Sequence, residues 1–178
     1  MLILSNGTVW AEENRFHNPE RIGLGLTLGH SYDPEPTFGF MQVTGIVQYD
    51  YDQIMLHRAP EVLYFKVEGS LGAAGFNGNI RLMTSVNILA QYYLERFNTE
   101  NLRPYAEAGT GLIYTDFQVE GQGLRLNFNP QAGIGCELRS GKGAVWFTNF
   151  RIHHLSNGSL YHENRGINSV SLQAGSYF

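Results

Sequence analysis

The chain has 178 residues and a formal net charge of −4, and its only lysines are Lys66 and Lys142. This balance excludes the basic stripe that binding to a nucleic-acid backbone requires. The single cysteine, Cys136, excludes an internal disulfide framework, and no apolar run reaches the roughly 18 residues of a transmembrane helix. The length suits one domain, and 21 glycines with many aromatic residues favour short strands and turns.

Residues 1–11 resemble the end of a secretory signal peptide. An apolar start is followed by Val9-Trp10-Ala11, with small residues at the −3 and −1 positions of a cleavage site, although the basic start of a signal is absent. We therefore expect residues 1–11 to be the remnant of a signal peptide and residues 12–178 to form a single domain. The sequence leaves open whether residues 1–11 are retained.

From Arg21 onward, apolar residues alternate with small or polar ones, a period-2 pattern that predicts strands. The predicted strands are Arg21–His30, Thr37–Tyr51, Val62–Gly72, Ile80–Leu94, Leu102–Tyr114, Leu126–Arg139, Gly143–Ser156 and Gly166–Phe178. Short turns or polar loops join them, including Asp50–Pro60, Gly72–Gly78 and Asp116–Gly123. The pattern predicts an all-β fold, an eight-stranded antiparallel up-and-down β-barrel.

The face that points outward distinguishes two kinds of barrel. A soluble lipocalin-like carrier turns its apolar face inward around a ligand, whereas a transmembrane barrel turns it toward lipid. Strands of about 10 residues or more favour the transmembrane barrel, and the terminal Phe178 resembles the last residue of outer-membrane proteins. The lumen of such a barrel would hold Lys66, Glu68, Arg81, Glu107, Glu137, Arg139 and Arg151. We expect its glutamates to pair with Lys66, Arg81 and Arg139 as a structural plug.

The segment Ile152–Gly166 concentrates half of the six histidines beside two serines and a glutamate. Alternation assigns His154 and Ser156 to the apolar, lipid-facing side and His153 to the lumen. The Cα atoms of His154 and Ser156 would lie about 6.6–6.8 Å apart, and Asn168 would lie close to opposite Ser156 across the hairpin. Because both ends of an even-stranded barrel normally lie in the periplasm, we expect this hairpin, and a site in it, at the extracellular leaflet of a bacterial outer membrane.

A zinc site is the other chemistry that these side chains suggest. His153, His154, His162 and Glu163 are all ligand types that zinc accepts. However, His153 and His154 point to opposite faces of one strand, so a single ion cannot readily use both. We expect no metal ion and no organic cofactor.

Three short motifs carry a family resemblance. His154-x-Ser156-Asn157, Asn164-x-Gly166-Ile167 and Ser169-x-Ser171-Leu172 resemble the C-terminal signature of the PagL family of lipid A 3-O-deacylases. Upstream, Leu126-Asn127-Phe128 and the segment 104–111 are similar to that family's strands. The resemblance covers about the last 75 residues well and the first half only in barrel pattern.

The resemblance implies a role for each site residue. His154 would be the general base and Ser156 the nucleophile, Asn157 beside Gly158 would help to bind the oxyanion, and Phe128 would be the aromatic residue next to the site. The family has a glutamate as third triad member where this sequence has Asn168. An asparagine can orient the imidazole but supplies no negative charge, and Glu163 is an alternative if its loop folds back.

The predicted function is hydrolysis of the ester-linked 3-hydroxyacyl chain at the 3-position of lipid A by a serine esterase. Its partners would be lipopolysaccharide and the outer membrane, and a homo-oligomer is compatible with the sequence. Two alternatives remain at this point: a non-catalytic outer-membrane barrel that serves adhesion or envelope stability, and a soluble lipocalin-like lipid carrier.

Overall fold

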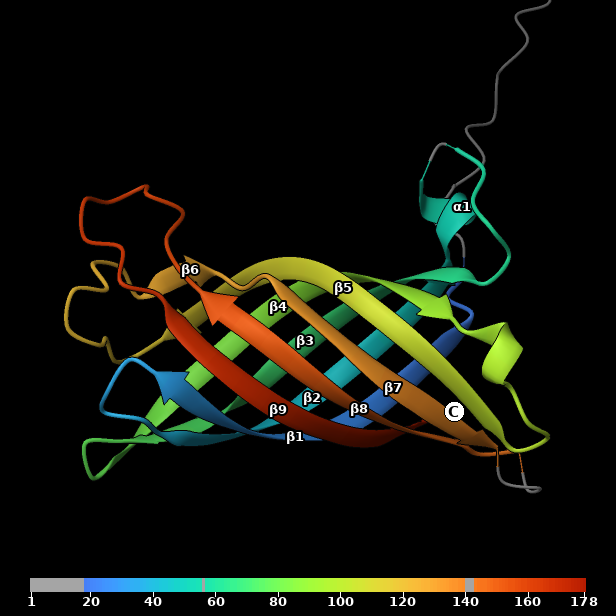
Figure 1. The fold of residues 1–178 in the computed structure, drawn as a ribbon, viewed down its shortest axis with the longest axis horizontal. Helices are drawn as coiled ribbons and strands as arrows, with labels where there is room; N and C mark the ends of the chain where they lie inside the picture. The colour runs from blue at the N-terminus through green and yellow to red at the C-terminus, as the bar shows by residue number, and fades with distance from the viewer. Residues whose placement is uncertain (1–17, 56, 140–142) are drawn as a thin grey trace, which may run out of the picture.

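The computed structural model describes residues 18–55, 57–139 and 143–178, which form one closed antiparallel barrel (Figure 1). The predicted signal remnant, residues 1–11, lies outside the described residues. The strands are β1 (Arg21–Asp33), β2 (Gly39–Asp50), β3 (Leu63–Phe76), β4 (Asn79–Tyr93), β5 (Leu102–Thr115), β6 (Leu126–Phe128), β7 (Gln131–Arg139), β8 (Val145–Leu155) and β9 (Ile167–Tyr177). Between them lie the short α-helix α1 (Tyr51–Ile54) and the 3₁₀ helix η1 (Glu95–Phe97).

Successive strands pair antiparallel, apart from β6 and β7, and β9 pairs with β1 to close the barrel. Strands β6 and β7 both pair with β5 and are separated only by Asn129 and Pro130, where proline cannot donate a ladder hydrogen bond. They therefore act as one interrupted strand, and the predicted eight-stranded up-and-down barrel is confirmed. No helix in the described residues is long and apolar enough to cross a membrane.

One predicted loop, Gly72–Gly78, is wrong. Strand β3 continues through it to Phe76, with Ala74 and Phe76 buried inside the barrel. The connection to β4 is the pair Asn77-Gly78, whose φ angles of 49° and 73° are typical of the two-residue hairpin turn that this dipeptide favours. A row of small residues before the turn obscured the alternation.

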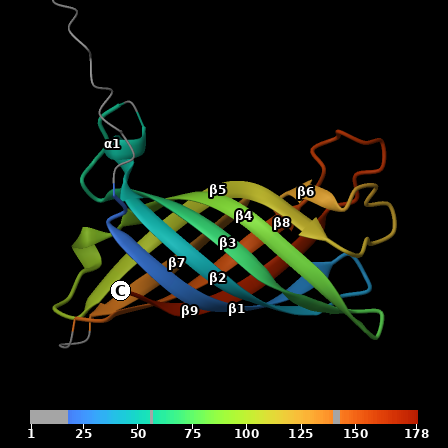
Figure 2. The same ribbon diagram turned by 180° about the vertical axis from the view of Figure 1, so that it is seen from behind.

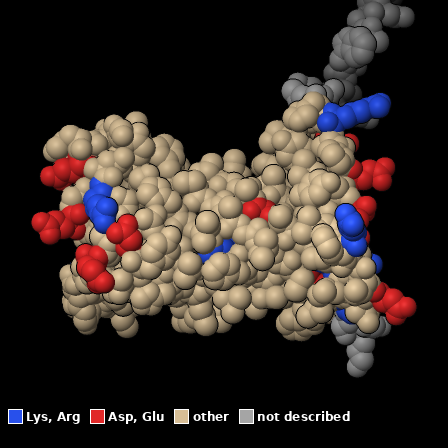
Figure 3. All heavy atoms as spheres, in the orientation of Figure 1, with Lys and Arg blue, Asp and Glu red and all other residues tan. Residues whose placement is uncertain are grey.

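The outer wall of the barrel is apolar. On β1, Leu24 is 54% exposed and Leu28 is 53% exposed, whereas the intervening Thr27 is buried. Figure 3 shows that, on the face in view, the middle of the molecule exposes few charged side chains, which gather at both ends. Each such leucine left in water forgoes about 1.5–3 kcal/mol of burial free energy. The wall is thus built for lipid contact, and the soluble lipocalin-like alternative is wrong.

The middle of the lumen is filled by a charge network. Arg151 binds both oxygens of Glu68, at 2.6 and 2.7 Å, and donates from Nε to Glu107 at 2.5 Å. Lys66 contacts both glutamates, and all four side chains are buried. Two cations and two anions therefore neutralise one another away from water, as a buried ionic cluster requires.

Two predicted members of the lumen are wrong. Arg81 lies near the start of β4 and Arg139 is the last residue of β7, and both side chains are exposed rather than buried in the lumen. Glu137 pairs instead with Arg21, at 2.9 Å.

The C-terminus and the beginning of β1 lie at one end of the barrel, together with α1 and η1 (Figures 1 and 2). The end opposite the C-terminus, called here the distal end, carries the β1–β2, β3–β4, β5–β6 and β8–β9 connections. A buried apolar cluster packs inside the distal part: Phe38, Phe40, Ala74, Phe76, Met83, Ile113, Phe117, Val119, Leu155 and Ile167. The sequence did not predict it, because several members come from loops that fold inward.

Candidate active site

The last residues of β8 alternate as predicted. Leu155 is 3% exposed and packs in the distal cluster, so that its neighbours His154 and Ser156 face outward. The backbones of Ser156 and Phe128 exchange two hydrogen bonds, at 2.8 and 3.1 Å, and the His154 N–H donates to the carbonyl of Pro130. The strand that carries the two site residues is therefore fixed on both its inner face and its β6–β7 edge.

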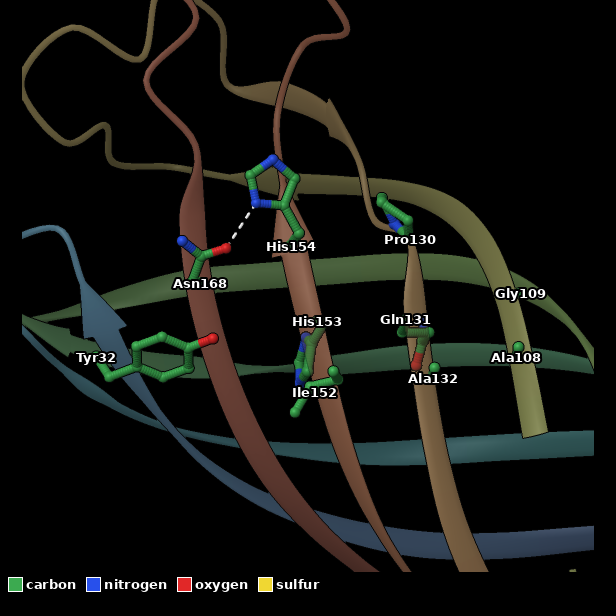
Figure 4. Close-up of a pocket in the computed structure, with 10 residues that line it drawn as sticks. All are labelled: Tyr32, Ala108, Gly109, Pro130, Gln131, Ala132, Ile152, His153, His154 and Asn168. Carbon is green, nitrogen blue, oxygen red and sulfur yellow. Dashed lines mark hydrogen bonds between the residues drawn. The ribbon is translucent and has the colours of Figure 1, made fainter. Parts of the chain in front are cut away.

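His154 and Asn168 form a side-chain pair. The Nδ1 atom of His154 lies 2.7 Å from Oδ1 of Asn168, and Figure 4 shows the two side chains facing each other from neighbouring strands. The expected position of Asn168 opposite Ser156 is wrong, because Leu155 pairs with Ile167 and this register sets Asn168 directly opposite His154. Direct pairing brings an imidazole and an amide within hydrogen-bonding reach.

Gly166 leaves the space that the imidazole fills. A Cβ atom at Gly166 would lie 2.3 Å from Cε1 and 2.9 Å from Nε2 of His154, closer than any side chain tolerates. In Figure 4 the ring leans from its strand toward the loops of the distal end. Nε2, the nitrogen that does not contact Asn168, lies against Gly166, and no hydrogen bond in the described residues joins it to Ser156.

Asn157 points into the barrel and is 1% exposed. Its Nδ2 donates to the carbonyls of Gln122 and Glu163, and its backbone N–H donates to Oδ1 of Asn164. The donors of Asn157 thus hold the distal loops together and are not directed at Ser156.

Gly158, by contrast, is exposed and has a φ of 62°, and a Cβ atom added there would lie 3.0 Å from the ring of Phe128. No described residue accepts a hydrogen bond from its N–H. Phe128 itself is 40% exposed beside the site. The expected neighbours Gly158 and Phe128 are therefore both brought next to Ser156.

Glu163 and His153 lie apart from the outward pair. The Glu163 side chain is 56% exposed and lies 3.9 Å from His162, and no hydrogen bond in the described chain joins it to His154. His153 faces the lumen as predicted, where Nε2 lies 3.1 Å from Oγ of Ser171 and the ring packs edge-on against Phe40.

A groove of about 340 Å³ runs along the outer wall beside the pair (Figure 4). Its floor includes Ala108, Gly109 and Ala132, and His154 and Asn168 border it. Ala108 pairs with Ala132, and Ala132 pairs with Ile152. Ile152 is the outward residue of β8 that precedes His154, so these alanines lie nearer the middle of the barrel than the His154–Asn168 pair. Small side chains on two adjacent strands thus leave an apolar depression below the site.

Sequence reasoning missed this groove and one further carboxylate. Asp33, at the end of β1, accepts a hydrogen bond from Nδ2 of Asn168 at 2.8 Å. Alternation places an alanine on a face of its strand but does not predict a depression there, and no local pattern relates Asp33 to a residue that follows it by more than a hundred positions. Only the closure of β9 on β1 brings the two together.

The comparisons with known proteins agree with this fold. The family model for lipid A 3-O-deacylase (PagL) matches residues 5–176. The crystal structure of the outer membrane enzyme PagL is similar with a TM-score of 0.58 and 22% identity, over 86% of this chain and 97% of that one. Neisserial surface protein A (NspA) is similar with a TM-score of 0.66 and 13% identity, over 88% and 94% of the two chains. No curated protein matches.

Proposed function

The chain belongs to the PagL family of lipid A 3-O-deacylases, and we propose that it is a serine esterase that removes the 3-hydroxyacyl chain at the 3-position of lipid A. The observation that carries this proposal is the hydrogen bond between His154 and Asn168 on the lipid-facing wall, next to Ser156. Polar side chains that face hydrocarbon are costly and are retained mainly where they serve a function.

His154 is the general base in this proposal. Asn168 Oδ1 can only accept, so Nδ1 of a neutral His154 donates to it and Nε2 keeps its lone pair. That lone pair takes the proton of the Ser156 hydroxyl while Oγ attacks the ester carbonyl carbon. The protonated imidazole then gives its proton to the departing sugar oxygen, which leaves the acyl chain on Ser156. In the second half of the reaction, His154 takes a proton from water while the water oxygen attacks the acyl carbonyl. The imidazole gives that proton to Oγ of Ser156, and the 3-hydroxy acid is released.

The tetrahedral intermediate carries a negative oxygen that needs donors. We assign this role to the backbone N–H of Gly158, two residues after Ser156, rather than to the side chain of Asn157, whose donors hold loop carbonyls. A preorganised N–H at such a position contributes roughly 3–4 kcal/mol of transition-state stabilisation in esterases and proteases. Phe128 packs against Gly158 and keeps it in place.

The groove offers a position for the acyl chain. An ester bound at Ser156 leaves its hydrocarbon tail directed toward the middle of the membrane, over Ala132 and Ala108. The barrel wall is apolar throughout this region, as a lipid substrate requires. With the C-terminus in the periplasm, the site lies in the outer leaflet of the outer membrane, where lipopolysaccharide is found.

Expression of the protein in cells with unmodified lipid A tests the proposal. Mass spectrometry of extracted lipid A is expected to show the loss of one 3-hydroxyacyl group with the natural chain and no loss with Ser156→Ala. Ser159→Ala, on the exposed hairpin three residues further on, is the matched control and should retain activity. An acyl loss that survives in Ser156→Ala, or no loss with the natural chain, contradicts the proposal and favours a non-catalytic barrel.

Filling the groove should impair binding of the acyl chain. Ala132→Phe places a ring over the groove floor and is expected to raise KM for lipid A roughly tenfold or more, the equivalent of about 1.4 kcal/mol or more of lost binding. Ile134→Phe, on the same face of β7 but outside the groove, is the control. Steady-state kinetics in detergent micelles would distinguish the two variants, and equal KM values for both would rule out the groove as the acyl site.

A further inference from the structure

Behind the His154–Asn168 pair lies the carboxylate of Asp33. Nδ2 of Asn168 donates to Oδ2 of Asp33 at 2.8 Å, and Arg165 donates to Oδ1 of the same carboxylate at 2.6 Å. The four side chains form one continuous chain of hydrogen bonds, from His154 through Asn168 and Asp33 to Arg165. The four side chains come from the end of β8, the beginning of β9, the end of β1 and the β8–β9 hairpin, respectively.

A β-bulge gives Asp33 its position. Ser31 pairs with Ser169, but the next pair is Asp33 with Asn168, so that Tyr32 is an extra residue in β1. In a regular ladder Tyr32 would stand opposite Asn168 and no carboxylate would reach the amide. Bulges re-aim side chains and are frequent next to active sites. The displaced Tyr32 borders the groove in Figure 4.

We propose that Asp33 is a positioning residue that fixes the orientation of the Asn168 amide and, through it, the tautomer of His154. The proposal rests on the function proposed above and goes beyond it. A carboxylate only accepts hydrogen bonds, so the NH₂ group of Asn168 must face Asp33. The carbonyl of Asn168 must then face His154, and the imidazole must carry its proton on Nδ1.

This chain of donors has a chemical consequence. With the proton on Nδ1, the lone pair of Nε2 is free to accept the Ser156 proton. The negative charge of Asp33 also polarises the amide, so that its carbonyl stabilises the imidazolium that forms during the reaction. Asn168 and Asp33 together thus supply the hydrogen-bond acceptor and the negative charge that a glutamate supplies in one side chain.

The first test measures the tautomer without any substrate. In protein labelled with ¹⁵N-histidine, spectra recorded where the imidazole is neutral distinguish the protonated from the unprotonated ring nitrogen, and His154→Gln identifies the His154 signals. The natural chain is expected to show the Nδ1–H tautomer. Asp33→Asn allows the Asn168 amide to turn over, and the Nε2–H tautomer should rise to a comparable population. An unchanged tautomer in Asp33→Asn overturns the proposal.

The second test measures the rate. Asp33→Asn is expected to lower kcat roughly 10- to 100-fold, the usual range when a residue that orients a reactive group is removed. Asn168→Glu brings a carboxylate directly to His154, so in that background Asp33→Asn should leave kcat unchanged or raise it by relieving repulsion between two carboxylates. An equal loss in both backgrounds indicates a merely structural role and overturns the proposal.

Two controls separate the remaining explanations. Glu35→Gln removes a carboxylate from the same connection, where among the described residues it accepts only from the Thr37 N–H, and should leave kcat and tautomer as they are. Arg165→Gln breaks the bridge between the loops but keeps Asp33 and should retain the Nδ1–H tautomer. If Arg165→Gln reproduces Asp33→Asn, the role of Asp33 is to anchor the hairpin. Failure of the proposed function is distinguished from failure of this proposal, because in that case the natural chain itself does not deacylate lipid A.

Discussion

Replacement of His154 by glutamine is expected to lower the rate of lipid A deacylation on the order of 10⁴-fold or more. Glutamine can still donate its amide hydrogen to Asn168, but it has no nitrogen that accepts a proton from Ser156. Removal of the base from a serine–histidine unit costs about as much as removal of the nucleophile, because the two act together. Single-turnover release of 3-hydroxy acid from purified lipid A in detergent micelles is the measurement.

The matched control for this change is His162→Gln. His162 belongs to the same hairpin, and its side chain is 73% exposed and contacts only its chain neighbours Tyr161 and Glu163 among the described residues. The same chemical substitution there should change the rate by no more than a fewfold. Combination of His154→Gln with Ser156→Ala should add little to either loss, and fully multiplicative losses would show that the two side chains do not act as one unit.

Replacement of Arg151 by methionine is expected to lower the free energy of unfolding by about 3–5 kcal/mol. Arg151 supplies five hydrogen bonds to Glu68, Glu107, Gln131 and Gln173 and is buried in the lumen. Its loss leaves Lys66 as the single cation between two buried carboxylates. Urea titration of the barrel in lipid vesicles, followed by tryptophan fluorescence and by heat-modifiable mobility on gels, measures the change.

A second substitution makes this prediction specific to charge. Arg151→Met with Glu107→Gln restores one cation to one anion and should be less destabilised than the sum of the two single changes. Arg139→Met, at the exposed end of β7, is the control and should cost no more than about 1 kcal/mol. A strictly additive double variant, or an equal loss at Arg139, would contradict a network held by buried charge balance.

The barrel and the two faces of its wall follow from alternation, because successive side chains of a strand must point to opposite sides. That rule alone separated His153 from His154 and set His154 with Ser156 on the outer wall, as the structure has them. It failed at strand ends. Arg81 and Arg139 have the correct parity for the lumen but are exposed near strand ends, and parity carries no information about depth.

The sequence by itself thus determined the fold, the lipid-facing wall and the outward position of His154 and Ser156, since each depends on local periodicity. Only the tertiary structure decided what surrounds them. The register of β8 against β9 set Asn168 opposite His154, the bulge at Tyr32 brought Asp33 behind it, and neighbouring alanines on β5 and β7 opened the groove. These are relations between strands, and they are fixed by pairing register and barrel closure rather than by any residue's own neighbours in the chain.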